Sequence, residues 1–168
     1  MERNILIIYY SYSGKTRRIA EMLHRQIGGR LSQIYPRQPY PADFERLLSQ
    51  VREKNSTGKL PSLLPVTESA DQYDVVFAGS PNWCGTIAPP LAAWLKRNDL
   101  DGKILIPFFC HCGGEDKGMK QAVRNLCPTA EIRSSLYVLE NGSGNLQDTI
   151  QAWLKQIFSE EGKECLQL

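Results

Sequence analysis

The sequence predicts an α/β protein with a three-layer α/β/α sandwich around a doubly wound, five-stranded parallel sheet. Segments with the apolar pattern of a strand and segments with the pattern of a helix alternate five times along the 168 residues. The first strand segment, Ile5–Tyr10, is a continuous apolar run, typical of a parallel strand that is buried on both faces. We detect no internal repeat and no second domain, so we expect a single domain over residues 1–168.

Each predicted strand is a short run of apolar or β-branched residues bounded by turn residues. The second run is short and weak, and the others are strongly apolar. The predicted strands are Ile5–Tyr10, Leu31–Tyr35, Val75–Ala78, Ile104–Phe109 and Leu136–Leu139.

The predicted helices follow the strands and carry apolar residues three or four positions apart. Gly28–Gly29 ends the first helix, Pro41–Asp43 opens the second, and the third begins after Pro89–Pro90. Residues 55–67 read as a loop. The inward faces are predicted to be Ile19, Met22, Leu23 and Ile27; Phe44, Leu47, Leu48 and Val51; Leu91, Trp94 and Leu95; Met119, Ala122, Val123 and Leu126; and Leu146, Ile150, Leu154 and Ile157.

The bulk composition favours a cytoplasmic protein with reduced thiols. The apolar fraction is 42%, and no run approaches the 18 apolar residues of a membrane span, so we expect neither membrane insertion nor a removed leader. A formal charge of +2 without a dense basic run predicts no nucleic-acid role. The five cysteines are an odd number and widely spread: Cys84, Cys110, Cys112, Cys127 and Cys165.

The loop after the first strand, Ser11–Thr16, has the composition of an anion site. In a doubly wound sheet, ligands bind outside the carboxyl ends of the strands. This loop places three Ser/Thr hydroxyl groups and several backbone N–H groups at a helix N-terminus, where Gly14 lets the backbone approach a phosphate closely. The simpler alternative is an ordinary turn in which Ser13 caps the helix.

Neither a nucleoside triphosphate nor a dinucleotide is predicted to bind this loop. Gly14-Lys15-Thr16 matches the end of the triphosphate-binding motif, but the glycine that motif requires five positions earlier is Tyr9 here. The glycine fingerprint of dinucleotide-binding folds is also missing.

The loop after the third strand, Gly79–Thr86, combines a flexible backbone with one large ring. Trp83 stands among Gly, Pro and Asn at the carboxyl end of a strand, which suits stacking on a flat aromatic ligand. Alternatively, Trp83 plugs the edge of the sheet.

The loop after the fourth strand runs Phe109–Gly114, and its glycines let main-chain amides face a ligand. Cys110, His111 and Cys112 raise the possibility of a metal site, but ligands one residue apart do not have the usual zinc spacing, and we predict no metal. A disulfide between the two cysteines would close a strained ring and is not expected.

Taken together, these three segments resemble the flavodoxin family. Ser11–Thr16 matches that family's Ser/Thr-x-Ser/Thr-Gly-x-Thr loop for the FMN phosphate, and Gly79–Thr86 resembles the Gly-Ser-Pro-Asn-Trp-x-Gly-Thr loop that flanks the flavin in a bacterial subgroup. Phe109–Gly114 resembles its partner loop. The resemblance implies a flavodoxin-like fold with strand order 2-1-3-4-5. Two features depart from it: Cys84 replaces a frequent second tryptophan, and the chain is slightly basic where flavodoxins are acidic.

The resemblance implies one non-covalent FMN, with the phosphate at the first loop and the flavin ring between the other two. The implied cofactor-binding residues are Ser11, Tyr12, Ser13, Gly14, Lys15, Thr16, Ser80, Pro81, Asn82, Trp83, Cys84, Gly85, Thr86, Cys110, His111, Cys112 and Gly113. No residue is expected to act as a catalytic acid or base, because the flavin carries the redox chemistry.

Three functions remain open. The first is an electron carrier that serves redox partner proteins or a nicotinamide-dependent reductase. The second is an FMN-dependent enzyme that passes electrons from NAD(P)H to a quinone-type acceptor, and the third is a flavin-free regulatory or binding domain on the same fold. We expect a monomer or a homodimer.

Overall fold

A parallel sheet forms the middle layer of the computed structural model, which describes residues 3–65, 68–114, 116–140, 142 and 144–164, the last five of these as backbone only. The strand order is β2-β1-β3-β5, with β6 and β7 both pairing with β5 in parallel on its other side. This confirms the predicted order 2-1-3-4-5, in which the fifth position is shared by two short strands. The strands are β1 (Ile5–Tyr9), β2 (Arg30–Gln33), β3 (Val75–Trp83), β5 (Ile104–His111), β6 (Glu131–Ile132) and β7 (Leu136–Leu139).

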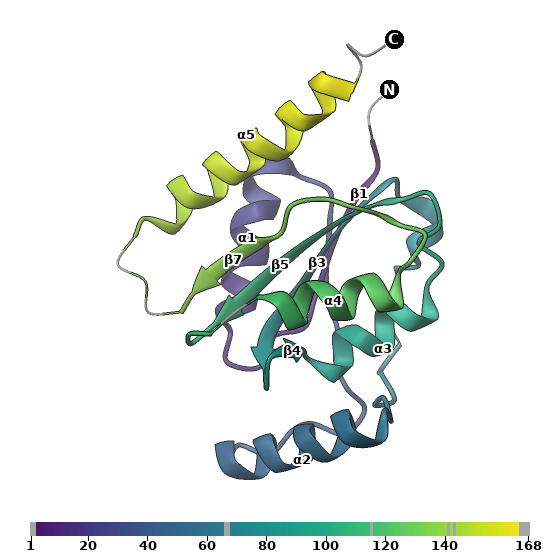
Figure 1. The fold of residues 1–168 in the computed structure, drawn as a ribbon, viewed down its shortest axis with the longest axis vertical. Helices are drawn as coiled ribbons and strands as arrows, with labels where there is room; N and C mark the ends of the chain where they lie inside the picture. Colours follow the sequence, from purple (N-terminus) through teal and green to yellow (C-terminus); the bar gives the residue numbers. More distant parts are fainter. Residues whose placement is uncertain (1–2, 66–67, 115, 141, 143, 165–168) are drawn as a thin grey trace.

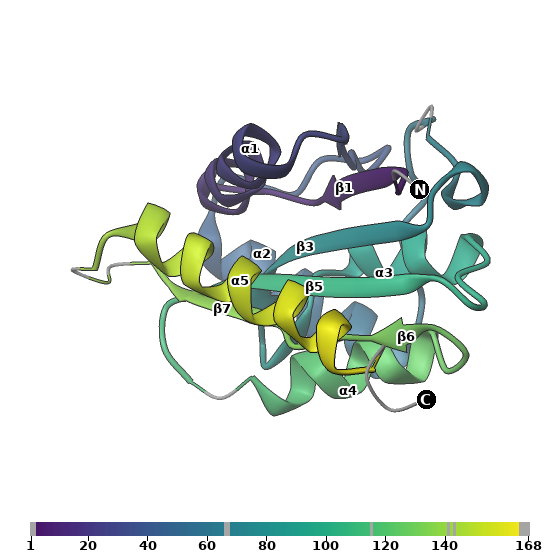
Figure 2. The same ribbon diagram turned by 90° about the horizontal axis from the view of Figure 1, so that it is seen from above.

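The helices cover both faces of this sheet (Figures 1 and 2). On one face, side chains of α1 (Lys15–Ile27) and α5 (Leu146–Glu164) form a core with the sheet. The other face is covered by α3 (Pro89–Arg97) and α4 (Lys117–Leu126), and α2 (Phe44–Thr57) joins that core beside α3. The predicted three-layer sandwich is therefore confirmed. A short 3₁₀ helix, η1 (Ala70–Gln72), precedes β3.

Strand β3 is buried along almost its whole length, as its apolar sequence predicts for a central parallel strand. Gly79 lies where β3 passes the ring of Phe108 on β5. A Cβ atom at this position would lie 2.2 Å from the ring, so only glycine allows the two strands to pair here.

Helix α1 begins directly beyond the carboxyl end of β1 and turns its apolar stripe toward the sheet. Ile19, Ala20 and Leu23 are at most 1% exposed. The helix ends where Gly28 takes a positive φ of 68°, and the backbone N–H of Gly28 donates to His24 O. The local sequence thus fixes both the direction of α1 and its length.

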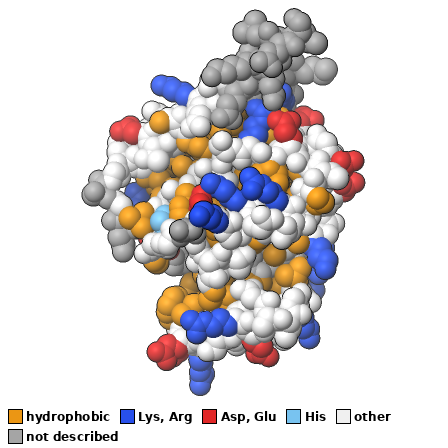
Figure 3. Space-filling view, viewed as in Figure 1, with side chains coloured by type: hydrophobic (Ala, Val, Ile, Leu, Met, Phe, Trp, Pro, Cys, Tyr) orange, Lys and Arg blue, Asp and Glu red, His pale blue; other side chains and the backbone are white. Residues whose placement is uncertain are grey.

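Two predictions for α2 were wrong. Phe44 was expected to face inward but is 61% exposed, because the helix turns only Leu47 and Val51 fully into the core. The helix also continues to Thr57, three residues into the segment expected to be a loop. Figure 3 shows hydrophobic side chains at the surface over α2 and where it adjoins the rest of the molecule.

The predicted loop after β3 is largely a strand. β3 continues to Trp83, turns at Cys84–Gly85 and pairs antiparallel with β4 (Thr86–Ile87). β5 likewise extends to His111, so Cys110 and His111 lie in the sheet. The carboxyl edge is therefore stiffer than the glycine-rich sequence suggested. No helix within the described residues is long and apolar enough to cross a membrane.

Candidate functional site

The loop between β1 and α1 carries free backbone donors at the start of the helix. Gly14 is the N-cap of α1 in a left-handed conformation, with φ 88°, and no side chain caps the helix there. Instead, the Oγ atom of Ser11 accepts a hydrogen bond of 3.2 Å from the backbone N–H of Arg17. The alternative in which Ser13 is the cap is therefore not what the structure adopts.

Backbone N–H groups of residues 13–16 point from this loop without an acceptor among the described residues. Thr16 adds a hydroxyl group whose side chain is only 2% exposed. Unpaired amides at the positive end of a helix dipole stabilise an anion, so this donor set has the chemistry of a phosphate site. A Cβ atom at Gly14 would meet no atom within 4 Å, which leaves room beside the loop.

The side chain of Lys15 contacts another residue at the carboxyl edge of the sheet. Its ammonium forms an ion pair with Glu140, the residue directly after β7. The hydrogen bond to Glu140 raises the pKa of Lys15. Burial raises the pKa of Glu140, but hydrogen bonds from Lys15 and Cys112 outweigh it and hold that pKa below the ordinary value. Both groups are therefore charged at neutral pH.

Trp83 lies beneath three tyrosines and is 6% exposed. Tyr10, Tyr12 and Tyr40 approach it edge-on, with ring centroids 5.4, 5.7 and 5.0 Å away. The hydroxyl of Tyr12 donates to Pro41 O at 2.8 Å, which holds that ring over Trp83. The indole thus joins the phosphate-type loop to the β3–β4 hairpin, and in this arrangement little of it faces solvent.

The hairpin and the end of β5 are connected through Tyr137 of β7. The Nδ2 atom of Asn82 donates to the hydroxyl of Tyr137 at 2.8 Å, and Asn82 Oδ1 accepts from the backbone N–H of Gly85 at 3.0 Å. The imidazole of His111 stacks on the Tyr137 ring with centroids 3.7 Å apart and planes 7° from parallel. Its Nδ1 atom accepts from Gly113 N at 3.0 Å. These contacts hold the two predicted flanking segments side by side.

The start of α4 packs directly on the hairpin turn. A Cβ atom at Gly118 would lie 2.0 Å from the carbonyl oxygen of Gly85, so glycine is required at this contact. The segment after β5 and the segment after β3 therefore meet at the same edge as the loop after β1, as expected for the carboxyl ends of parallel strands.

Cys110 and Cys112 share one acceptor. Their Sγ atoms lie 3.6 Å and 3.2 Å from the two carboxylate oxygens of Glu140. Burial raises the pKa of Cys110 to about 12, and the bond to Glu140 raises the pKa of Cys112. Among the described residues the cysteines are free thiols, and no cluster of three potential ligands could hold a metal ion. Cys165 lies outside the described residues.

Ser80 and Pro81 are placed differently from the other predicted site residues. The hydroxyl of Ser80 is fully buried, donates to Pro81 O at 2.8 Å and accepts from Ala88 N at 2.8 Å. The hydrogen bond from Ala88 connects the end of β4 and the start of α3 to β3. The side chain of Ser80 therefore serves the hairpin and does not reach the edge where the three loops meet.

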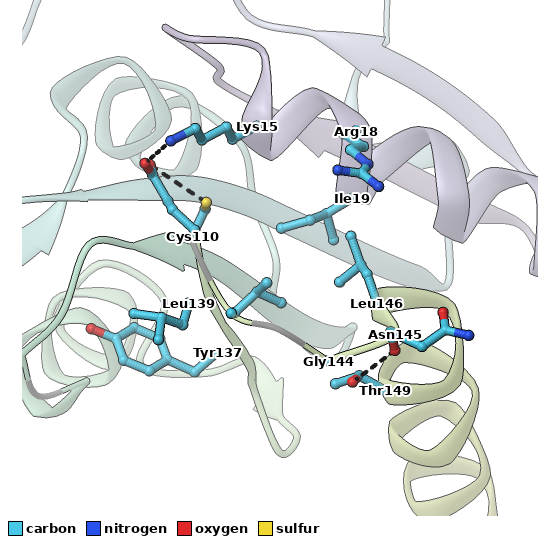
Figure 4. Close-up of a pocket in the computed structure, with 13 residues that line it drawn as sticks. Lys15, Arg18, Ile19, Cys110, Tyr137, Leu139, Gly144, Asn145, Leu146 and Thr149 are labelled. Carbon is cyan, nitrogen blue, oxygen red and sulfur yellow. Dashed lines mark hydrogen bonds and ion pairs between the residues drawn. The ribbon is translucent and has the colours of Figure 1, made fainter.

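A cavity of about 400 Å³ opens between α1 and the start of α5, and Lys15 and Glu140 line it. Figure 4 shows Lys15 and Cys110 at one end of it, and Asn145 and Thr149 of the α5 end at the other. The predicted hairpin residues do not line this cavity. It adjoins the predicted phosphate loop through Lys15, and of the predicted ring-flanking residues Cys110 lines it.

A family model described as flavodoxin matches residues 4–157 of the chain. The chain belongs to the flavodoxin family. A search of curated proteins found no match.

Solved structures with the same fold cover nearly all of this flavodoxin-family chain. A protein from Bacteroides eggerthii is 28% identical, with a TM-score of 0.80 over 93% of this chain and 98% of that one. A flavoprotein from Lactobacillus acidophilus, solved in complex with FMN, is 20% identical, with a TM-score of 0.74 over 91% and 99%. A flavodoxin from Fusobacterium nucleatum, solved bound to flavin mononucleotide, is 11% identical, with a TM-score of 0.59 over 95% and 99%. The last two likenesses show the shared fold alone.

Sequence reasoning missed four residues at this flavodoxin-type edge. Tyr10, Tyr40, Tyr137 and Glu140 all contact predicted site residues. Tyr10 and Glu140 follow directly on strands β1 and β7, so the carboxyl-end rule could have found them. Tyr40 and Tyr137 gave no such signal.

Proposed function

We propose that this chain binds one FMN non-covalently at the carboxyl edge of the sheet and uses it to transfer electrons between redox partners. The observation that carries the proposal is the set of unpaired backbone N–H groups at residues 13–16, where the loop after β1 passes into α1. The side chain of Thr16 adds a hydroxyl group to this set. Membership of the flavodoxin family and the FMN-bound neighbours of the same fold support it.

In this proposal the phosphate lies against the amides and hydroxyls of Ser11–Thr16. The flavin ring lies between the β3–β4 hairpin and the segment from His111 to Gly113, which Tyr137 connects. The flavin, when bound, supplies the redox chemistry. The protein holds and orients it, excludes water with Trp83 and the tyrosines around it, and presents the imidazole of His111 to one edge.

Because tyrosines cover Trp83, the flavin ring cannot reach the indole without a change in their positions. Because Tyr12 lies over the indole and is itself 37% exposed, a ring that stacks on Trp83 has to displace Tyr12. A flavin that leaves Tyr12 in place contacts that tyrosine instead. Either arrangement uses the same loop and the same hairpin.

Titration of the purified chain with FMN tests the proposal. Replacing Ser13 and Thr16 together with alanine should weaken FMN binding at least about tenfold, because hydrogen bonds to a charged phosphate are lost. Cys112→Ala should weaken it less. Isothermal calorimetry measures the dissociation constants.

The matched control is the double replacement of Ser56 and Thr57 with alanine at the far end of α2, where both hydroxyls bond only to the helix backbone. It removes the same two hydroxyl types and should leave FMN affinity unchanged. Equal losses for Ser13/Thr16 and for Cys112 would mean that the phosphate loop is misassigned, and absence of FMN uptake would refute the proposal. Stopped-flow oxidation of NADPH by the FMN-loaded chain then separates an electron carrier, which needs a separate reductase, from an NAD(P)H-dependent enzyme.

A further inference from the structure

Glu140 is a fixed negative charge beside the predicted phosphate loop. Its backbone N–H donates to His111 O at 2.8 Å, which continues the pairing of β7 with β5. Its side chain is 14% exposed, and its carboxylate accepts from the thiols of Cys112 and Cys110 as well as from Lys15. Because Cys110 on β5 and Cys112 directly after it both donate to the carboxylate, Glu140 keeps two hydrogen bonds when the lysine leaves it.

Lys15 is the movable partner of this ion pair. It is the first residue of α1, its side chain is 44% exposed, and the ammonium ends a flexible four-carbon stem. Its own backbone N–H belongs to the group of unpaired donors at residues 13–16. The ammonium is therefore within reach of two anions, the carboxylate of Glu140 and a phosphate bound at the loop.

We propose that Glu140 reduces the preference of the site for FMN over riboflavin by competing with the FMN phosphate for Lys15. Riboflavin has the same ring and ribityl chain but no phosphate, so only FMN gains from a free ammonium at residue 15. Glu140 thereby determines how much of the binding energy depends on the phosphate. The inference rests on the proposed FMN site.

The other cations of this helix start do not replace Lys15. Arg17 pairs with Glu21 one turn further along α1. Arg18 lines the cavity between α1 and α5, as Lys15 and Glu140 also do (Figure 4), but the ion pair of Glu140 is with Lys15. The competition therefore concerns one lysine and one glutamate, which two substitutions can separate.

The experiment measures dissociation constants for FMN and for riboflavin by calorimetry in the wild-type chain, Glu140→Gln, Lys15→Met and the double variant. Glu140→Gln should tighten FMN about two- to fivefold, the range for a partly exposed ion pair, and leave riboflavin unchanged. Lys15→Met should weaken FMN selectively. In the Lys15→Met background, Glu140→Gln should no longer change FMN affinity.

Glu21→Gln is the matched control, because it removes the same charge from α1 beside Arg17 and not beside Lys15. It should leave the ratio of the two dissociation constants unchanged. Circular dichroism verifies that each variant is folded, and Glu140→Ala serves as a second test if Glu140→Gln is not.

The outcomes separate the inference from the proposed function. An unchanged FMN affinity in Glu140→Gln, an equal change for riboflavin, or an effect that persists without Lys15 overturns the inference and leaves the FMN site standing. If the wild-type chain binds neither flavin, the proposed function fails and the inference with it.

Discussion

The four cysteines that the structure describes differ in what their thiols touch, and this sets how readily each one reacts. Cys110 and Cys127 are 2% and 4% exposed, and burial raises their pKa values to about 12 and about 11. Cys112 is exposed, but its thiol donates to the carboxylate of Glu140, which raises its pKa. Cys84 is exposed at the hairpin turn and has no such acceptor among the described residues.

Among these four, we therefore expect iodoacetamide at pH 8 to label Cys84 fastest and to leave Cys110 and Cys127 nearly unmodified, because the thiolate is the reactive form. Glu140→Gln should speed the labelling of Cys112 and not that of Cys84, which serves as the internal reference. Peptide mapping by mass spectrometry reads each site separately. Labelling of Cys110 as fast as Cys84 in the folded protein would contradict this assignment.

The β3–β4 hairpin turns on two residues with positive φ. Cys84 has φ 56° and Gly85 has φ 80°, the combination that two-residue hairpin turns require and that Asn-Gly adopts best. A cysteine in the left-handed region carries steric strain, since its Cβ atom crowds the backbone. The turn is therefore strained at one position.

Cys84→Asn should raise the free energy of unfolding by about 1 kcal/mol, because asparagine tolerates the left-handed conformation better. Urea denaturation measures the change. Cys84→Ser is the control: it removes the thiol but keeps the strained backbone, so its stability should match the wild type. A stabilisation of equal size in both variants would assign the effect to the thiol.

At the scale of the whole molecule, the Lys15–Glu140 pair joins residues 125 positions apart, the start of α1 and the end of β7. It links the first βα unit to the last strand across the carboxyl edge. Burial raises the pKa of Glu140, but the hydrogen bonds from Lys15 and Cys112 together lower it by more than burial raises it. The pKa in the folded protein therefore lies below the ordinary value of 4.5. The pair therefore stabilises the fold fully above about pH 4.5, and this stabilisation is lost as the pH falls through the pKa that Glu140 has in the folded protein.

The wild-type chain should accordingly be more stable than Glu140→Gln at pH 7, and the difference should shrink toward zero at an acid pH below the folded pKa of Glu140, where the carboxylate is protonated. Urea denaturation at the two pH values measures it. Glu21→Gln, which removes an exposed pair on α1, should show little difference at either pH. A gap that persists at low pH would mean that Glu140 stabilises the protein through packing and not through its charge.

Local sequence was enough for the parts of the site that lie within one βα unit. Ser11–Thr16 could be recognised because its donors are consecutive, and the doubly wound sheet followed from the alternation of elements, whereas the strand order followed from the resemblance to flavodoxins. The hairpin was not recognised, because Gly79–Thr86 is as rich in turn residues as a loop, and only pairing of Asn82 with Ile87 makes it a strand. The exposure of Phe44 was missed because apolar spacing alone does not say where a helix sits on the core.

By itself, the sequence determined the α/β class and the donor loop after β1, because these depend on periodicity and on neighbouring residues, while the order of the strands was implied by the resemblance to flavodoxins. Tertiary structure alone decided that Lys15 meets Glu140, that Tyr137 stacks on His111 and that three tyrosines cover Trp83. Parallel strands bring their carboxyl ends to one edge from distant parts of the chain. Which side chains then touch depends on the register of those strands and on the packing of α1 and α4, which no local pattern encodes.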